Sequence, residues 1–320
     1  MSAILRRPQL PEALLQSLPR LLALLLLCLS LSLLSDVFLT WGNAINVLRQ
    51  TSLLFIGASG LTLVVLTAGL DLSVGSTIGL AACVAGTVIK ATGEPLLGAL
   101  CAIGIGAAAG LLNGLMVAML RIPSFIATYG MLWVLQGLAY FYMAGQAVFG
   151  FPHGFRQLGR GLFLGIPIPI FVMAAVLTLG SFILRSTTVG QQIYAIGGNA
   201  VSARLSGVPV RRRLLLVYVL SGTMAGLASL VFLAQLNSAQ ADIGSTLTLP
   251  AIAAVLVGGT SLFGGVGSLS GTFIGALLLT LVLNGMNLLD VDAAWQPLAT
   301  GCIILAAVYL DTRASRSRRG

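Results

Sequence analysis

Long uninterrupted runs of apolar residues dominate this sequence and restrict what it can fold into. Hydrophobic residues make up 58% of the 320 residues and charged residues only 8%, whereas soluble domains carry about 25% charged residues. The apolar runs are continuous rather than alternating, so they predict membrane-spanning helices and not the strands of a barrel. One span needs about 20 residues, so the chain has room for about ten spans and none for a separate soluble domain.

The sequence therefore predicts an all-α, polytopic membrane helix bundle. The expected spans cover about 21–39, 47–68, 76–92, 96–119, 124–144, 162–184, 214–236, 247–263, 268–287 and 294–310. Arginines ahead of the first run resemble a secretory signal, but no small-residue cleavage site follows, which favours an uncleaved first span. Three glycine-rich segments, 57–60, 69–75 and 258–267, are read either as packing sites or as interrupted helices that surround a pathway.

Segment 185–213 is the longest polar interval between these runs. It carries five arginines and no acid, and basic loops accumulate on the cytoplasmic side of membrane proteins. With the N-terminus inside and ten spans, 13 of the 17 basic residues fall in inside segments. This bias predicts cytoplasmic N- and C-termini, and it explains the net charge of +9 without nucleic acid. Part of the loop, 199–206, is helix-competent and offers a docking place for a soluble partner.

The predicted organisation is a cytoplasmic N-terminal segment, 1–20, a single transmembrane domain, 21–311, and a basic cytoplasmic tail, 312–320. The loop 185–213 belongs to the transmembrane domain. Glycines at four-residue spacing, as in 106–114, 222–226 and 267–275, allow helix backbones to approach closely. We read them mainly as packing motifs.

Several classes of chemistry are excluded by simple absences in the sequence. Lys90 is the only lysine and has no P-loop glycines before it, so ATP must be hydrolysed by another polypeptide. His153 is the only histidine, and the four cysteines lie in apolar runs without CxxC spacing. We therefore predict no enzymatic site, no metal and no cofactor.

Polar residues inside or beside the spans are the candidates for a translocation pathway. Asp71 lies at a glycine-containing helix break with Ser73 and Ser76 nearby, and is either a helix cap or a functional carboxylate. The other candidates are amides, which suit a hydroxyl-rich solute but also form hydrogen bonds between helices. They are Asn113, Gln136, Asn284, Asn287 and Gln296.

The segment 145–163 interleaves aromatic residues with arginines. On the outer face it is expected to anchor the chain at the membrane interface. The alternative is contact with an external protein that delivers the solute.

Several motifs, in order, resemble the ribose-type sugar permeases of ATP-binding cassette (ABC) importers. Segment 69–76, GLDLSVGS, resembles the family's GIDLSVGS. The other matching segments are 194–199, 206–208, 251–255, 258–265, 284–289 and 295–296. The sequence departs from the family pattern at Thr248, where an acid is common, and also at Tyr129 and Gln136.

The resemblance implies a permease subunit in a bacterial inner membrane that imports a monosaccharide. Its expected partners are two ATPase subunits, a periplasmic sugar-binding protein, a second permease subunit and the lipid bilayer. In such importers a short cytoplasmic helix couples ATPase closure to the pathway, and the matching positions here are Gly198, Asn199, Ala203, Arg204 and Gly207. The alternative function is a stand-alone carrier or channel coupled to an ion through Asp71.

Overall fold

The computed structural model describes the backbone of residues 10–319. The expectations for residues 1–9 and 320 lie outside the described residues, as do those for most side chains of the predicted terminal segments.

Residues 10–319 form nine long helices, four shorter helices and two small two-stranded sheets. The long helices are α1 (Leu10–Leu34), α2 (Trp41–Leu66), α3 (Val74–Thr92), α4 (Pro95–Ala118), α5 (Ser124–Met143), α7 (Ile168–Ser186), α10 (Val210–Leu236), α12 (Leu269–Leu288) and α13 (Trp295–Arg319). The shorter ones are α6 (His153–Arg160), α8 (Thr188–Gly198), α9 (Ala200–Leu205) and α11 (Thr248–Val257), with a 3₁₀ turn, η1 (Ser245–Leu247). Strand β1 (Val148–Phe149) pairs antiparallel with β4 (Ser238–Ala239), and β2 (Leu162–Phe163) with β3 (Ile166–Pro167).

Within residues 10–319, seven helices are long and apolar enough to cross a membrane. They are α2, α3, α4, α5, α7, α10 and α12. The prediction of an all-α, multi-pass membrane bundle is therefore confirmed at this level.

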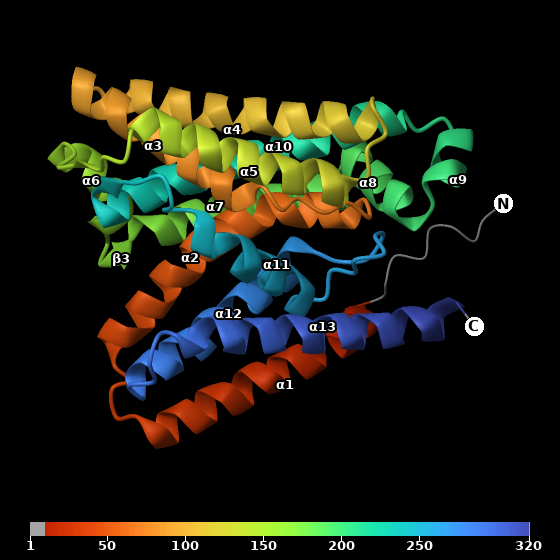
Figure 1. The fold of residues 1–320 in the computed structure, drawn as a ribbon. Helices are drawn as coiled ribbons and strands as arrows, with labels where there is room; N and C mark the ends of the chain where they lie inside the picture. The colour runs from red at the N-terminus through yellow and green to blue at the C-terminus, as the bar shows by residue number, and fades with distance from the viewer. Residues whose placement is uncertain (1–9, 320) are drawn as a thin grey trace.

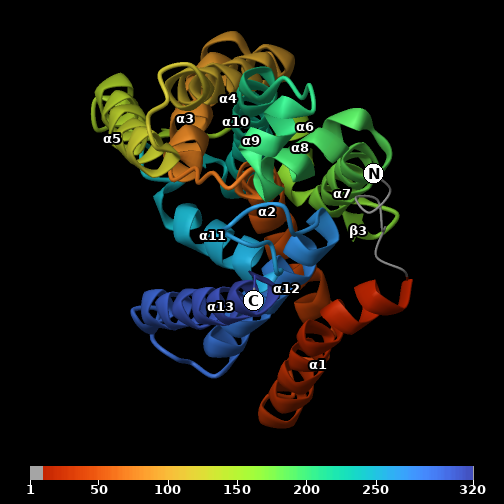
Figure 2. The same ribbon diagram turned by 90° about the vertical axis from the view of Figure 1, so that its right-hand side faces the viewer.

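Helix α2 is the centre of the bundle, and most of its residues from Thr51 onward are buried. It lies between a group formed by α3, α4, α5 and α10 and a second group formed by α1, α12 and α13 (Figures 1 and 2). Helices α8 and α9 lie at one end of the molecule, and α6 and β3 lie at the other (Figure 1).

Glycines fix how closely the central helices approach, as their spacing predicts. A Cβ added at Gly106 of α4 would overlap the carbonyl oxygen of Gly222 of α10, and one added at Gly222 would overlap the carbonyl oxygen of Gly106. Gly275 of α12 meets Ala254 of α11 in the same way. Backbone-to-backbone contact of this kind supplies the dispersion energy that lipid does not.

Two expected spans have other bounds in the structure, and one glycine-rich segment is a packing site. The span expected at 247–263 contains a helix of only ten residues, Thr248–Val257, which is about 15 Å long against a hydrocarbon core of about 30 Å. The span expected at 162–184 begins at Ile168 because the preceding residues form the β2–β3 hairpin. Segment 57–60 is not a break, because Gly60 continues α2 and packs against the backbone of Ser221.

The other two glycine-rich segments fall largely in connections between helices, although Val74 and Gly75 already belong to α3. The chain leaves helical conformation between α2 and α3, and again between α11 and α12. Ala68 (φ 58°) and Gly259 (φ 78°) turn the backbone at these two places. We call residues 67–73 the first break and residues 258–268 the second break.

Candidate functional site at two helix breaks

The first break is held by side chains from a neighbouring helix. The Ser124 hydroxyl accepts a hydrogen bond from the Leu70 backbone N–H at 3.1 Å. The Thr128 hydroxyl accepts one from the Leu72 N–H, also at 3.1 Å. Backbone that leaves a helix inside a bilayer needs such partners, so α5 provides what the interrupted helix cannot.

Asp71 is the acidic centre of the first break, with 2% of its surface exposed. One carboxylate oxygen accepts hydrogen bonds from the backbone N–H (3.0 Å) and hydroxyl (2.7 Å) of Ser73. The other accepts from the Ser221 hydroxyl of α10 at 3.0 Å. Asn113 of α4 donates to the Ser73 hydroxyl at 2.8 Å. The structure thus brings Asp71 and Asn113 into one network. The Asp71 carboxylate accepts from the backbone N–H two residues on, which is a turn just ahead of α3, whose N-cap is Ser73.

One atom in this network has no partner. The side-chain oxygen of Asn113 is buried and makes no hydrogen bond within the described residues. A buried, unpaired acceptor costs free energy, so this oxygen is available to a hydrogen-bond donor that reaches the break.

The second break is tied to the last helix. The Asp311 carboxylate of α13 accepts hydrogen bonds from the Ser261 hydroxyl and the Leu262 backbone N–H, both at 3.1 Å. The Ser261 N–H also closes the loop on the Val266 carbonyl at 2.9 Å. The carboxylate therefore pairs a hydroxyl and an N–H of the break that have left the helix.

The two breaks meet each other and α8 at one place, which we call the junction. The Gly265 N–H donates to the Leu66 carbonyl at the end of α2 at 2.9 Å. The Tyr194 hydroxyl of α8 donates to the Gly267 carbonyl at 2.9 Å. A Cβ added at Gly197 would overlap both the Leu66 oxygen and the Gly265 nitrogen. Helix α8 therefore touches the end of α2, next to the first break, and also the second break, backbone against backbone.

The expected helix in the polar loop is present as α9. The Asn199 side-chain oxygen accepts hydrogen bonds from the N–H groups of Val201 and Ser202, both at 3.0 Å. An asparagine at this position caps a helix start, and here it is also the only residue between α8 and α9. The two helices consequently form a bent unit.

Helix α9 exposes nearly all of its surface. Only Ala203 is buried, in a small cluster with Ile196 and Val210. Val201 is 68% exposed and Leu205 is 84% exposed, which leaves apolar side chains without cover in a polar region. Gly207 (φ 84°) turns the chain back toward α10.

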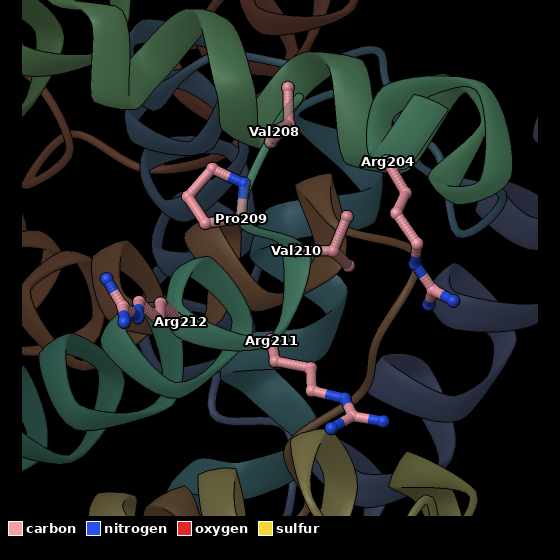
Figure 3. Close-up of a pocket in the computed structure, with 6 residues that line it drawn as sticks. All are labelled: Arg204, Val208, Pro209, Val210, Arg211 and Arg212. Carbon is pink, nitrogen blue, oxygen red and sulfur yellow. The ribbon is translucent and has the colours of Figure 1, made fainter. Parts of the chain in front are cut away.

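An open hollow of about 340 Å³ lies beside α9. Its lining residues are Arg204, Val208, Pro209, Val210, Arg211 and Arg212. Figure 3 shows the Arg204 and Arg211 side chains extending from α9 and from the start of α10, with Arg212 directed away from them. The surface suits a partner that offers acidic and apolar groups.

The remaining pathway candidates are dispersed. Gln136 of α5 donates to the Ala241 carbonyl at 2.8 Å. Gln296 of α13 donates to the Asn287 side-chain oxygen of α12 at 2.8 Å. The six candidates therefore lie at four separate places and do not form one wall in this conformation.

Asn284 and Asn43 form a buried pair that links α12 to α2. Each donates to the side-chain oxygen of the other, at 2.8 and 3.2 Å. The pair acts as an interhelical hydrogen bond, the other role open to these amides.

Several residues of the site were not among the predicted ones. They are Ser221, Thr128, Tyr194, Asn43 and Asp311. Each contacts a partner far away in sequence, and a single hydroxyl or amide in an apolar run gives no local signal. Only Asp311 gave a local signal in the sequence, because it ends the last apolar run.

Comparison with known proteins decides the family. The family model described as "Branched-chain amino acid transport system / permease component" matches residues 43–308. The chain belongs to this permease family. The permease is 42% identical over 297 residues to the ribose import permease protein RbsC of Escherichia coli strain K12, and the match covers 92% of each chain.

Other relatives extend the comparison. The permease is 38% identical over 307 residues to RbsC of Bacillus subtilis, with 95% of each chain covered. It is 36% identical to the autoinducer 2 import system permease protein LsrC of Klebsiella pneumoniae, over 83% of this chain and 78% of that one. No solved structure matches the permease. The expected membership of the ribose-type sugar ABC importer permeases is confirmed.

Proposed function

We propose that this permease forms the translocation pathway of an ATP-driven importer for a ribose- or xylose-like monosaccharide. The family and the similarity to ribose import permeases support a sugar ABC permease. A periplasmic binding protein delivers the sugar on the outer side, and a separate chain hydrolyses ATP.

In this proposal the transporter has two ATPase subunits, and α9 is the element of the permease on which an ATPase subunit docks. Gly198, Asn199, Ala203, Arg204 and Gly207 position or contact them. Exposed Val201 and Leu205 beside the arginine-lined hollow support a docking role. A second permease subunit completes the pathway in the bacterial inner membrane.

The proposed topology has ten segments in the membrane, with both termini cytoplasmic. Helix α1 begins, and α13 ends, at the end of the molecule where α9 lies (Figure 1). This placement supports putting the basic loop and both termini on one side. Helix α11 and the second break then count together as one interrupted span.

The observation that carries the proposal is the junction. Helix α8 touches the end of α2 and the second break at the same point through Gly197. A push on α9 therefore reaches both breaks by way of α8. Breaks change their backbone angles more readily than continuous helices, so they are suited to switch the pathway between inward and outward access.

The pathway residues stay a proposal. Asn287 is exposed and Gln296 is half-buried, so we assign them to direct contact with the sugar. Gln136 is assigned to the pathway as well, because of its position on α5. Asp71, Asn113 and Asn284 are buried and are assigned to the shell that moves with the breaks.

Reconstitution in proteoliposomes tests the proposal. We expect sugar uptake only when the permease, its ATPase and its binding protein are all present with ATP. Uptake by the permease alone that follows a proton or sodium gradient would instead establish the ion-coupled alternative. In that case Asp71→Asn would be the first variant to measure.

A further inference from the structure

Helix α6 carries a compact basic face at the end of the molecule opposite α9 (Figure 1). Arg156, Gln157 and Arg160 lie three, four and seven residues after His153, so the four residues share one side of the helix. Together they line an open hollow of about 330 Å³. The lining set contains two guanidinium groups, an imidazole and an amide, and no acid.

The opposite side of α6 fixes this face in position. Phe155 is buried and packs edge-to-face on Phe151, with ring centroids 5.8 Å apart. A Cβ added at Gly159 would overlap the Gln235 backbone nitrogen at the end of α10. The Arg160 Nε donates to the Gln235 carbonyl at 2.6 Å. The helix is therefore docked tightly enough to hold its basic residues in a set geometry.

Arg156 has donor capacity that the protein does not use. Its Nε is buried and has no hydrogen-bond partner within the described part of the chain. Because the Nε is closed to solvent, a ligand in the hollow would meet the terminal N–H groups of the guanidinium, and a phosphate oxygen is the acceptor that arginine binds best. Such an anion would also face Arg160 and His153 across the same hollow.

The surroundings of the hollow favour a lipid over a soluble partner. The β2–β3 hairpin directly follows α6 and exposes three apolar side chains in a row, Leu162 (60%), Phe163 (58%) and Leu164 (85%). An apolar tip beside a short basic helix is the pattern of a segment that lies in the membrane interface. With the tip among acyl chains, the basic face lies at the depth of the phosphates.

We propose that the basic face of α6 binds the phosphate of an anionic phospholipid headgroup. The ligand class is a phosphodiester carried by a lipid, and Arg156 is its main contact. The site is separate from the sugar pathway and from the α9 surface, and it does not depend on the proposed function.

The test measures lipid binding to the purified full-length protein by native mass spectrometry. The probes are short-chain phosphatidylglycerol, phosphatidylcholine and inorganic phosphate. We expect Arg156→Gln to weaken phosphatidylglycerol binding roughly five- to tenfold, since one basic residue near an anionic surface contributes about that much. Arg156→Lys keeps the charge and should retain most of the binding. Arg204→Gln, at the other end of the molecule, is the charge-matched control and should leave this binding unchanged.

Four results would overturn the proposal. Equal binding of phosphatidylcholine would remove the role of the anion, and full competition by millimolar inorganic phosphate would show a free-anion site. Unchanged phosphatidylglycerol binding in a folded Arg156→Gln protein would place the lipid elsewhere. Binding of an acidic soluble protein that depends on Arg156, in phosphatidylcholine bilayers and without any lipid effect, would assign the face to a protein partner. If Arg156→Gln misfolds, His153→Gln replaces it, with a smaller expected loss.

Discussion

Gly197 sets the distance between α8 and the two breaks. No side chain separates its backbone from the Leu66 carbonyl or the Gly265 N–H. A Cβ added at the next residue, Gly198, would meet no atom within 4 Å. Two adjacent glycines therefore differ completely in what a methyl group would meet, which makes them a matched pair.

We expect Gly197→Ala to lower the stability of the permease by about 1–3 kcal/mol, the usual cost of forcing atoms into a packed site. Gly198→Ala should leave stability nearly unchanged, or raise it slightly by favouring the helix. Thermal unfolding in detergent, followed by circular dichroism, compares the two. Equal unfolding temperatures would show that the junction is not packed as described.

The Asp71 network predicts a clear difference between two substitutions. Asp71→Asn keeps an oxygen for both Ser73 donors, and its amide can donate to the Ser221 hydroxyl. Asp71→Ala leaves all three donors unpaired, so it should cost about 2–4 kcal/mol. Thermal unfolding of both variants measures the difference. A large loss of stability in Asp71→Asn would mean that the negative charge itself is required.

At the scale of elements, α8 and α9 form one bent unit, which we call the lever, because the single capping residue Asn199 joins them. The lever has an exposed end on α9 and a buried end at the junction. Because Asn199 caps α9 as soon as α8 ends, we expect a displacement of α9 to move α8 as well. The exposed end can therefore be altered without unfolding the buried one.

We expect Leu205→Glu to impair ATP-driven transport without unfolding the permease. The side chain is 84% exposed, so folding and thermal stability should not change. ATP-driven sugar uptake in the reconstituted system should fall tenfold or more, because the docking surface loses an apolar contact and gains a repelled or desolvated charge. Ser206→Glu, on the neighbouring residue, controls for the added charge. Normal uptake in Leu205→Glu would exclude α9 as the docking element.

At the scale of the whole molecule, the distribution of charge predicts which end faces the cytoplasm. Introduced cysteines, in a background without the four native ones, report this by labelling with a membrane-impermeant maleimide. Ser206→Cys, beside α9, should react only after the cells are permeabilised. Glu94→Cys, in the turn between α3 and α4, should react from outside. The reverse pattern would invert the proposed topology.

The sequence predicted most of the helices because a bilayer demands long apolar segments, and hydropathy records them directly. Helix α9 was also predictable, since its cap at Asn199 is local. The end of α11 was not, because the apolar run continues while the backbone turns at Gly259. That turn is supported by Asp311 and by contact with α8, both distant in the chain.

The candidate site was predictable only in part. Asp71 and Ser73 are two residues apart, so a local turn or cap between them could be predicted from the sequence. Ser221 lies 150 residues further on, and nothing in its neighbours marks it. The pathway amides were visible as residue types, yet their separate pairings depend on how the helices pack.

Apart from the Tyr194 hydroxyl, the contacts at the junction are made by main-chain atoms and glycines, and none of them involves a residue assigned to the sugar. We therefore expect the segment proposed to engage the ATPase and the residues proposed to meet the solute to vary independently. Exchange of segment 185–213 between two such permeases should transfer the choice of ATPase while the recipient keeps its own cargo. In this proposal the ATPase-docking segment and the sugar pathway are two parts of one fold that can be exchanged separately.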